Sequence, residues 1–290
     1  MSPDSHTKVY AIIGNPVRHS FSPKMHNAAF RELGLNSVYT AFEVTNVEDA
    51  MKGVRALGIS GLSVTIPHKE AVIPYLDDID PIAEKIGAVN TILNNNGQLT
   101  GYNTDGAGAY RSIVDSGLDL NGKAIGIIGN GGTAKAVLYT LLDRVEIAHA
   151  HILGRDLDKV TSFIDKVKKE LPKPKTTDLV PYSYESATDD DLFLLPGNID
   201  LIINTTPVGM FPDDQRTPLP NYQFSADQTV FDAVYKPLET RLLQEAKRSN
   251  AKVIDGLSML VNQGVLQFEL WTGEKAPVRL MDSIVRDIFK

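Results

Sequence analysis

The sequence predicts an α/β protein built from two series of alternating strands and helices. Short apolar runs rich in β-branched residues alternate with amphipathic stretches from Val9 to Ile66, and the alternation resumes at Lys123. Two helical stretches close the chain after Gly256, with no predicted strand behind them. A chain of 290 residues, 42% of them hydrophobic, is long enough for two domains with cores of their own.

The first series begins with a predicted strand over residues 9–14. A helix should follow, because Ser22 is a good N-cap residue, Pro23 suits the first helical position and Gly34 ends the pattern. The pattern as a whole predicts βαβα with parallel strands. Its remaining elements are strands over residues 38–44, 61–66 and 88–91 and a helix over residues 47–57.

The second series begins with a strand over residues 123–128, a glycine-rich turn at Gly129 and a helix ending near Asp143. Residues 171–191 are rich in Pro, Lys, Thr and Asp and are interpreted as a surface connection. The other elements are strands over residues 148–153, 200–204, 229–233 and 252–254, and helices over residues 157–170, 238–249, 258–271 and 278–289. We expect the last two helices to pack on the first series.

The composition excludes several classes of function. A formal net charge of −7 and a pI near 5.4 argue against a nucleic-acid binder, since phosphate backbones require clustered Lys and Arg. The chain has no Cys, which excludes disulfides, thiolate catalysis and Cys-ligated metals. No apolar run approaches the length of a membrane span or a signal segment. We therefore expect a cytoplasmic protein that acts on a small molecule without a metal, nucleic acid or membrane.

A glycine-rich turn indicates a dinucleotide site. Residues 129–134 read G-N-G-G-T-A, which fits G-x-G-x-x-A between an apolar strand and a helix. Gly129 permits the tight turn, Gly131 lets a pyrophosphate approach the helix amides, and Ala134 allows close helix packing. A purely structural turn is the alternative. The pattern predicts a Rossmann-type doubly wound nucleotide-binding domain over residues 105–255, inserted into a discontinuous α/β substrate domain of residues 1–104 and 256–290.

The next strand ends at Gly154, where the residue that contacts the ribose is expected. Arg155 and Lys159 favour a 2′-phosphate and hence NADP, whereas Asp156 favours a free 2′-hydroxyl and hence NAD. A solvated helix start is an equally good interpretation of Asp158 and Lys159.

Polar residues near strand ends are candidates for substrate binding. Ser20 and Ser22 can present paired hydroxyls to a carboxylate, although an N-cap role also explains Ser22. Thr65 and Lys69 flank Pro67 at a strand-to-helix corner, where open α/β sheets bind ligands. The helix dipole disfavours a lysine at a helix start, which argues for a functional role of Lys69.

Later strands add further candidates. Asn90 is either a structural hydrogen-bonding residue or a ligand of a substrate hydroxyl. Asp105, together with Lys69, provides the carboxylate and ammonium that a carbonyl/alcohol redox step needs. Thr206 lies in a Pro/Gly-kinked loop expected near a nicotinamide, and Gln263 lies one helical turn beyond Met259.

Taken together and in order, these motifs resemble the shikimate dehydrogenase family from Val9 to about Lys290. The resemblance implies reversible, nicotinamide-dependent reduction of 3-dehydroshikimate to shikimate in aromatic amino-acid (chorismate) biosynthesis. It implies NADP as cofactor, with NAD as the alternative, and a monomer or homodimer. The motifs are Asn-Pro at 15–16, Ser-x-Ser-Pro at 20–23, Val-Thr-Ile-Pro-His-Lys-Glu at 64–70, Gly-Ala-Val-Asn-Thr at 87–91, Asn-Thr-Asp-Gly at 103–106, the glycine-rich turn and Gln263.

Carried over position by position, the resemblance makes Lys69 and Asp105 the catalytic pair and Ser20 and Ser22 the carboxylate binders. Lys69 then gives a proton to the substrate oxygen in reduction and accepts it in oxidation, while Asp105 holds Lys69 and the hydroxyl in register. The other substrate-binding residues are Thr65, Asn90 and Gln263 around the ring hydroxyls and Tyr235 close to the nicotinamide. The cofactor-binding residues are Gly129, Gly131, Gly132, Thr133, Arg155, Asp156, Lys159, Thr206 and Gly256.

Alternatives differ from this interpretation at single positions. The family usually has Asn-Arg-Thr where this chain has Gly154-Arg155-Asp156, which keeps the phosphate-binding Arg. A quinate or dual quinate/shikimate dehydrogenase would be favoured by Thr or Gly in place of Ser22. A non-catalytic metabolite sensor would be free to lose Lys69. A methylenetetrahydrofolate-type dehydrogenase explains the glycine-rich turn but not the paired serines.

Overall fold

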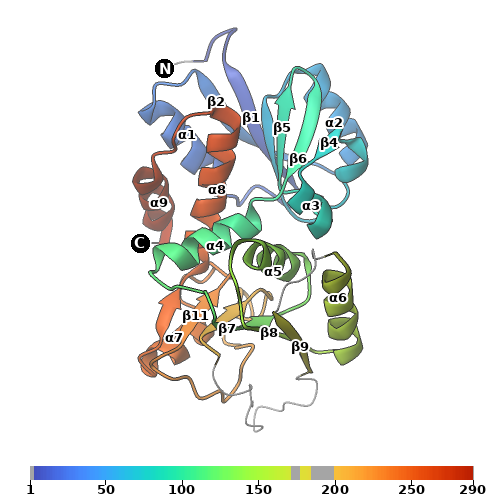
Figure 1. Ribbon diagram of the computed structural model, residues 1–290. Coiled ribbons are helices and arrows are strands. Elements are labelled where there is room, and N and C mark those ends of the chain that lie inside the picture. Colours follow the sequence, from blue (N-terminus) through green and yellow to red (C-terminus); the bar gives the residue numbers. More distant parts are fainter. Residues whose placement is uncertain (1–2, 171–176, 184–198, 290) are drawn as a thin grey trace. The chain divides into compact units, whose positions relative to one another are not determined.

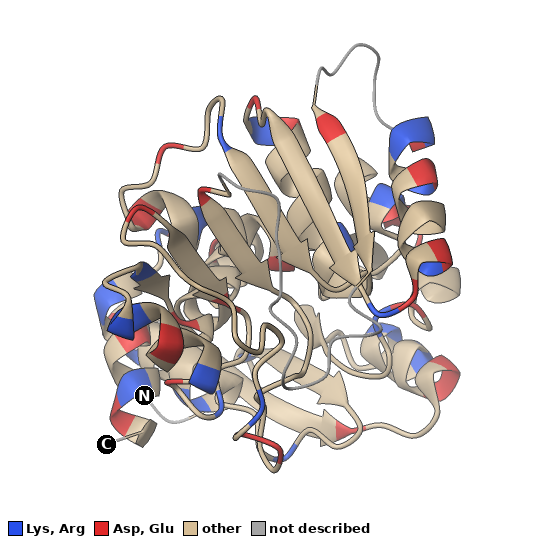
Figure 2. Ribbon diagram, turned by 90° about the horizontal axis from the view of Figure 1, so that it is seen from below, with Lys and Arg blue, Asp and Glu red and all other residues tan. Residues whose placement is uncertain are grey.

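The computed structural model shows an α/β protein with two sheets and flanking helices (Figure 1). It describes residues 3–170, 177–183 and 199–289. Lys, Arg, Asp and Glu lie mainly on helices and loops, whereas the strands are largely free of charge (Figure 2). No helix within the described ranges is long and apolar enough to cross a membrane.

The chain folds into two compact units. The first comprises Met1–Gly108 and Val261–Lys290, and the second comprises Ala109–Leu260. Both boundaries fall inside helices, namely α4 (Asp105–Asp115) and α8 (Gly256–Thr272).

The first unit contains a mixed sheet with the strand order β2-β1-β3-β5-β6-β4. The parallel pairing of β1 with β2 and with β3 confirms the βαβα prediction for this part of the sheet. The strands are β1 (Lys8–Gly14), β2 (Ser37–Glu43), β3 (Gly61–Val64), β4 (Asp78–Ile79), β5 (Thr91–Asn95) and β6 (Gln98–Tyr102).

The other half of this sheet departs from the prediction. β5 is antiparallel to both β3 and β6, and β4 is parallel to β6 at the edge. Asn96 and Gly97, with φ of 52° and 93°, form the two-residue turn between β5 and β6. Asn-Gly is the strongest short signal for such a hairpin, and the sequence interpretation missed it. The strand expected over residues 88–91 begins only at Thr91.

The helices of the first unit cover both faces of this sheet. α9 packs against α1, which confirms that the terminal helices return to the first series. Ser22 is the first residue of α1 and Phe21 is its N-cap, so the N-cap interpretation of Ser22 is wrong; Ser22 N instead donates to Ser20 Oγ at 3.2 Å. The helices are α1 (Ser22–Glu32), α2 (Val47–Ala56), α3 (Pro81–Ile86) and α9 (Val278–Arg286), with 3₁₀ turns η1 (Ile73–Tyr75) and η2 (Asp287–Phe289).

An aromatic cluster joins α1 and α8 to the sheet. Trp271 of α8 donates from its indole nitrogen to the carbonyl of Ile92 at 3.0 Å. Gly61 of β3 is required here, because an added Cβ would lie 2.5 Å from Trp271 Nε1. Trp271, near the end of α8, therefore packs over β3 and β5.

The second unit contains a fully parallel sheet with the strand order β12-β11-β10-β7-β8-β9. Numbered from its first strand and read from β9, this is the 3-2-1-4-5-6 order of the Rossmann fold, which confirms the predicted fold class. The strands are β7 (Ala124–Ile128), β8 (His149–Gly154), β9 (Asp178–Ser183), β10 (Leu201–Asn204), β11 (Thr229–Asp232) and β12 (Lys252–Ile254).

β9 corrects the interpretation of residues 171–191 as a surface connection. It is an edge strand parallel to β8, and its Pro181 is tolerated because only one side of an edge strand is paired. Residues 171–176 and 184–191 of that segment lie outside the described residues.

The helices of the second unit include α4, whose residues after Gly108 belong to this unit. α7 (Arg241–Arg248) begins three residues later than predicted, because Thr240 caps it and the Thr240 hydroxyl accepts from Leu243 N at 3.4 Å. The remaining helices of this unit are α5 (Gly132–Arg144) and α6 (Leu157–Glu170).

Candidate active site

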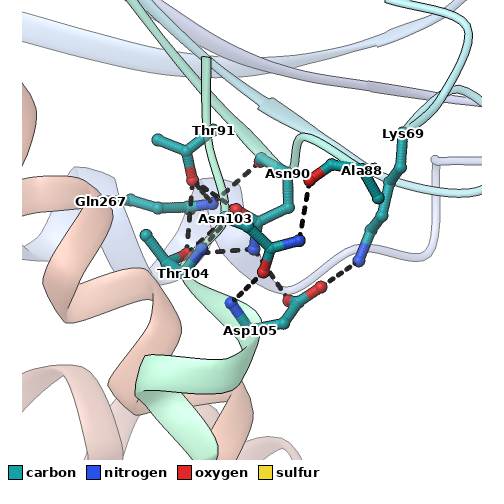
Figure 3. Close-up of polar contacts among 8 residues, drawn as sticks. All are labelled: Lys69, Ala88, Asn90, Thr91, Asn103, Thr104, Asp105 and Gln267. Carbon is teal, nitrogen blue, oxygen red and sulfur yellow. Dashed lines mark hydrogen bonds and ion pairs between the residues drawn. The ribbon is translucent and has the colours of Figure 1, made fainter. Parts of the chain in front are cut away.

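Lys69 and Asp105 form an ion pair in the first unit (Figure 3). Lys69 follows the end of β3, and its carbonyl is fixed by Val89 N at 2.8 Å. Asp105 is the first residue of α4. The Nζ–Oδ2 distance is 2.5 Å, and the two side chains are 29% and 14% exposed. The pair is therefore held by the fold and remains open to a small ligand.

Asn90 holds the carboxylate of Asp105 from the interior. Its Nδ2 donates to Asp105 Oδ1 at 2.8 Å, and its Oδ1 accepts from Thr104 N at 2.8 Å. Because a backbone N–H can only donate, this contact fixes the orientation of the amide. Asn90 is 2% exposed, and its contacts leave Asp105 Oδ2 facing Lys69.

Asn103 and Thr104 complete this arrangement; both belong to a motif recognised in the sequence, but neither was given a role of its own there. Asn103 Oδ1 accepts from Asp105 N at 3.1 Å, while its Nδ2 donates to the carbonyl of Ala88 at 3.0 Å (Figure 3). An Asn two residues before a helix start is a known turn signal, and that signal was available at Asn103. Asp105 is thus held by Asn90 and Asn103, whose amides make further hydrogen bonds, and Lys69 pairs with the carboxylate of Asp105.

The predicted substrate-binding residues of the first unit lie on neighbouring loops. Ser20 and Ser22 follow β1, and Thr65 follows β3, its parallel neighbour. Asn15 N donates to the carbonyl of Ile66 at 3.0 Å and ties these two loops together. The loops that carry these residues therefore lie at the same edge of the sheet as Lys69.

Two of these residues are largely buried. Ser22 is 4% exposed, and its hydroxyl hydrogen-bonds the side chain of Tyr39. Gln263 of α8 is 9% exposed and packs against Gly108, where an added Cβ would lie 2.8 Å from Gln263 N.

Tyr235 and Gly256 belong to the second unit, so the structure does not group them with Lys69. Tyr235 follows β11, and burial raises the pKa of its phenol. An added Cβ at Gly256 would lie 2.5 Å from the carbonyl oxygen of Val234, so this glycine permits a close backbone approach.

The glycine-rich turn of the second unit fits a pyrophosphate. Gly129 has a φ of 113°, and an added Cβ would lie 2.5 Å from Thr205 Oγ1, so only glycine suits this position. Gly131 is the N-cap of α5, and no side chain caps that end of the helix. Added Cβ atoms at Gly131 and Gly132 would meet open space. The amides of Gly132 and Thr133 are thus accessible to an anion at a helix N-terminus.

The charged residues after β8 separate into a pair and an unpaired residue. Asp156 accepts from Lys159 N at 3.1 Å and forms an ion pair with Lys159 Nζ, also at 3.1 Å. The backbone N–H and the ammonium of Lys159 lower the pKa of Asp156. Arg155 is exposed and has no carboxylate partner among the described residues. Arg155 therefore keeps its guanidinium available for a phosphate, which fits NADP.

A buried carboxylate supports the loops after β10 and β11. Thr206 Oγ1 donates to Asn204 Oδ1 at 2.7 Å, and Asn204 Nδ2 donates to Asp232 Oδ1 at 2.9 Å. The other oxygen of Asp232 accepts from Thr240 Oγ1 at 2.6 Å. Burial raises the pKa of Asp232 to about 6, although these hydrogen bonds oppose the shift. The sequence interpretation did not identify Asp232.

Comparison with known proteins places the chain in a family. A family model described as the shikimate dehydrogenase substrate binding domain matches residues 12–92, and one described as the shikimate 5′-dehydrogenase C-terminal domain matches residues 256–286. The shikimate dehydrogenase (NADP(+)) of Moorella thermoacetica is 44% identical over 284 residues, which cover 97% of this chain and 93% of the relative. The chain belongs to the shikimate dehydrogenase family, as its motifs predicted.

Solved structures agree over the full length. A crystal structure of a shikimate dehydrogenase in complex with NADP+ has a TM-score of 0.89 and 39% identity, and the match covers 100% of this chain and 98% of that one. The shikimate 5-dehydrogenase of Listeria monocytogenes, in complex with shikimate and NAD, has a TM-score of 0.87 and 35% identity, with 98% of each chain covered. These likenesses agree with the α/β and Rossmann-type architecture described above.

Proposed function

We propose that the protein catalyses the reversible, NADP-dependent reduction of 3-dehydroshikimate to shikimate in aromatic amino-acid biosynthesis. The observation that carries this proposal is the Lys69–Asp105 pair, held by Asn90 in a chain whose relatives are named shikimate dehydrogenase (NADP(+)). A quinate or dual-specificity enzyme is not favoured, because those relatives are named for shikimate and because Ser22 is present.

Lys69 is proposed to move the proton. When bound, the reduced cofactor supplies a hydride to the carbonyl carbon of the substrate. The ammonium of Lys69 gives a proton to the carbonyl oxygen, and in the oxidative direction the neutral amine takes the hydroxyl proton. Asp105 orients Lys69 through Oδ2, while Oδ1 is occupied by Asn90. A lysine so placed also stabilises the negative charge that develops on the oxygen.

Ser20 and Ser22 are proposed to bind the substrate carboxylate, with Thr65, Asn90 and Gln263 near the ring hydroxyls. Support comes from the shared sheet edge on which the loops after β1 and β3 lie. Tyr235 is proposed to contact the substrate from the second unit. The substrate-binding role thus falls mainly to the first unit.

Glycines and Arg155 of the second unit are proposed to hold NADP. The uncapped N-terminus of α5 suits the pyrophosphate, and the unpaired Arg155 suits the 2′-phosphate. Asp156 would favour NAD only if its carboxylate were free, but it is engaged by Lys159.

The test is an absorbance assay at about 340 nm, which follows the reduced nicotinamide. Purified protein is given shikimate with NADP, shikimate with NAD, and quinate with NADP. We expect the fastest turnover with shikimate and NADP. No turnover with shikimate and either cofactor would refute the proposal, and faster turnover of quinate would reassign the substrate.

A further inference from the structure

Gln267 lies on α8 one helical turn after Gln263, and both N–H groups and the oxygen of its amide are hydrogen-bonded. Its Nε2 donates to Thr91 Oγ1 at 2.9 Å and to the carbonyl of Asn90 at 3.2 Å, and its Oε1 accepts from Ser63 Oγ at 2.7 Å. The side chain is 1% exposed. An amide that is satisfied and buried in this way holds a single orientation.

The hydrogen bonds continue from Gln267 to the catalytic pair with a defined direction (Figure 3). Because Asn90 Oδ1 can only accept, the Thr91 hydroxyl, which accepts from Gln267, donates to it at 2.7 Å. Asn90 then donates to Asp105, which pairs with Lys69. Gln267 therefore reaches Lys69 through three intermediate residues, all within the first unit.

The opposite end of the chain of hydrogen bonds is anchored in the aromatic core. Tyr39 donates from its hydroxyl to Ser63 Oγ at 2.6 Å, and Ser63 donates to Gln267. Burial raises the pKa of Tyr39, so its phenol keeps its proton and remains a donor. The series Tyr39, Ser63, Gln267, Thr91 and Asn90 thus runs in one direction from the core to Asp105.

We propose that Gln267 is a positioning residue for the proton-transfer step. It fixes Asn90 through the backbone carbonyl and through Thr91, and Asn90 in turn sets where Asp105 holds the ammonium of Lys69. Small displacements of a catalytic group lower the rate strongly, up to roughly 100-fold for about 1 Å. The proposal rests on the function proposed above, in which Lys69 moves the proton.

The test compares Gln267→Met with Trp271→Phe. The first variant replaces the amide with an apolar side chain of similar length. The second, one helical turn further along α8, removes a similarly buried hydrogen bond to the neighbouring residue Ile92, outside the series that reaches Asp105. Unfolding midpoints, kcat and KM for shikimate, and the pH profile of kcat are measured for both.

We expect both variants to lose stability but only Gln267→Met to lose rate. Its kcat should fall roughly 10- to 100-fold with little change in KM for shikimate, and its pH profile should shift. Trp271→Phe should keep kcat and the pH profile of the wild type. A kcat for Gln267→Met within about twofold of wild type, or an equal loss in both variants, would overturn the proposal.

A second readout separates this proposal from the proposed function. The Cε resonance of Lys69, followed by NMR in ¹³C-lysine-labelled protein and assigned with Lys69→Arg, should move in Gln267→Met and not in Trp271→Phe. An unmoved resonance refutes positioning by Gln267 whatever the activity. A wild type without turnover refutes the enzyme assignment, whereas a moved resonance would still support the structural coupling.

Discussion

The two units bury their polar groups in different ways. In the first, a series of neutral side chains leads from Tyr39 to the partly exposed ion pair of Lys69 and Asp105. In the second, Asp232 is fully buried, and its donors among the described residues are all neutral, namely Asn204, Val234 N and Thr240. A charged pair at the end of a network remains available to a ligand, whereas a buried carboxylate with neutral partners organises loops.

His26 of the first unit and Asp232 of the second also respond to pH in opposite directions. His26 in the first unit has no hydrogen-bond partner on either ring nitrogen, and burial lowers its pKa to about 3. The folded state therefore loses stability as pH falls below about 6.5, because His26 cannot take up a proton that the unfolded chain binds. Asp232 has a raised pKa, so acidification stabilises its unit.

The largest effect on activity should come from Lys69, at the charged end of the hydrogen-bond series in the first unit. Lys69→Ala should lower kcat about 10²- to 10⁴-fold, because the general acid is lost, while KM for shikimate changes little because the serines remain. Lys52→Ala, which removes an exposed lysine paired with Glu48, is the control and should behave as wild type. Steady-state kinetics with both substrates check this, and an unaltered kcat would remove Lys69 from catalysis.

The next effect concerns Asp232. The folded state binds its proton more tightly than the unfolded state, since its pKa is about 6 instead of 3.8. The contribution of Asp232 to wild-type stability should therefore fall by roughly 2 kcal/mol as pH rises from about 4 to about 6. Asp232→Asn should lack this contribution. Its unfolding free energy relative to wild type, measured by denaturant titration across this range, should increase with pH.

Asp200→Asn is the control, because the pH dependence of its stability relative to wild type should have the opposite sign. Burial alone would raise the pKa of Asp200, but Lys123 and the amide of Ala124 outweigh it and the pKa is lowered. Its stabilisation is present above pH 4 and is lost at lower pH. This variant should be less stable than wild type at neutral pH, with a difference that shrinks on acidification. A pH-independent difference for Asp232→Asn would contradict the assigned role.

A smaller effect is expected at the cofactor end of the second unit. Arg155→Ala should raise KM for NADP roughly 10- to 100-fold, the worth of a charge-assisted contact to phosphate, and leave KM for NAD almost unchanged. Lys166→Ala, an exposed substitution further along α6, is the matched control. Equal changes for both cofactors would show that Arg155 does not contact the 2′-phosphate.

The smallest effect should appear in the loop after β1, which carries Ser20 and Ser22, the proposed carboxylate binders. Ser22→Ala should raise KM for shikimate about fivefold, as expected for one lost hydrogen bond of about 1 kcal/mol, with kcat less affected. Ser116→Ala, which removes a hydroxyl that bonds only the carbonyl of Ile113, should leave KM unchanged. A wild-type KM in Ser22→Ala would assign this hydroxyl to the support of Tyr39 alone.

Local sequence signals predicted the fold and the charged end of the site. Periodicity gave the parallel strands, the context of Gly129 indicated the Rossmann-type unit, and the order of motifs pointed to Lys69 and Asp105. The supporting residues could not be found in this way, because they meet only after folding. Ser63 and Gln267 are 204 positions apart, and Asn204 and Asp232 are 28 apart. No local pattern marks a glutamine or aspartate that will be buried against a distant strand.

The proposed proton transfer requires Lys69 and Asp105 to act as one unit. A double-mutant cycle on kcat with Lys69→Ala, Asp105→Asn and the double variant tests this. If Asp105 acts by holding Lys69, its substitution should matter little once the lysine is gone, and the double variant should be about as slow as Lys69→Ala. Effects that multiply to within about twofold would show that the two residues act independently, and would contradict the account.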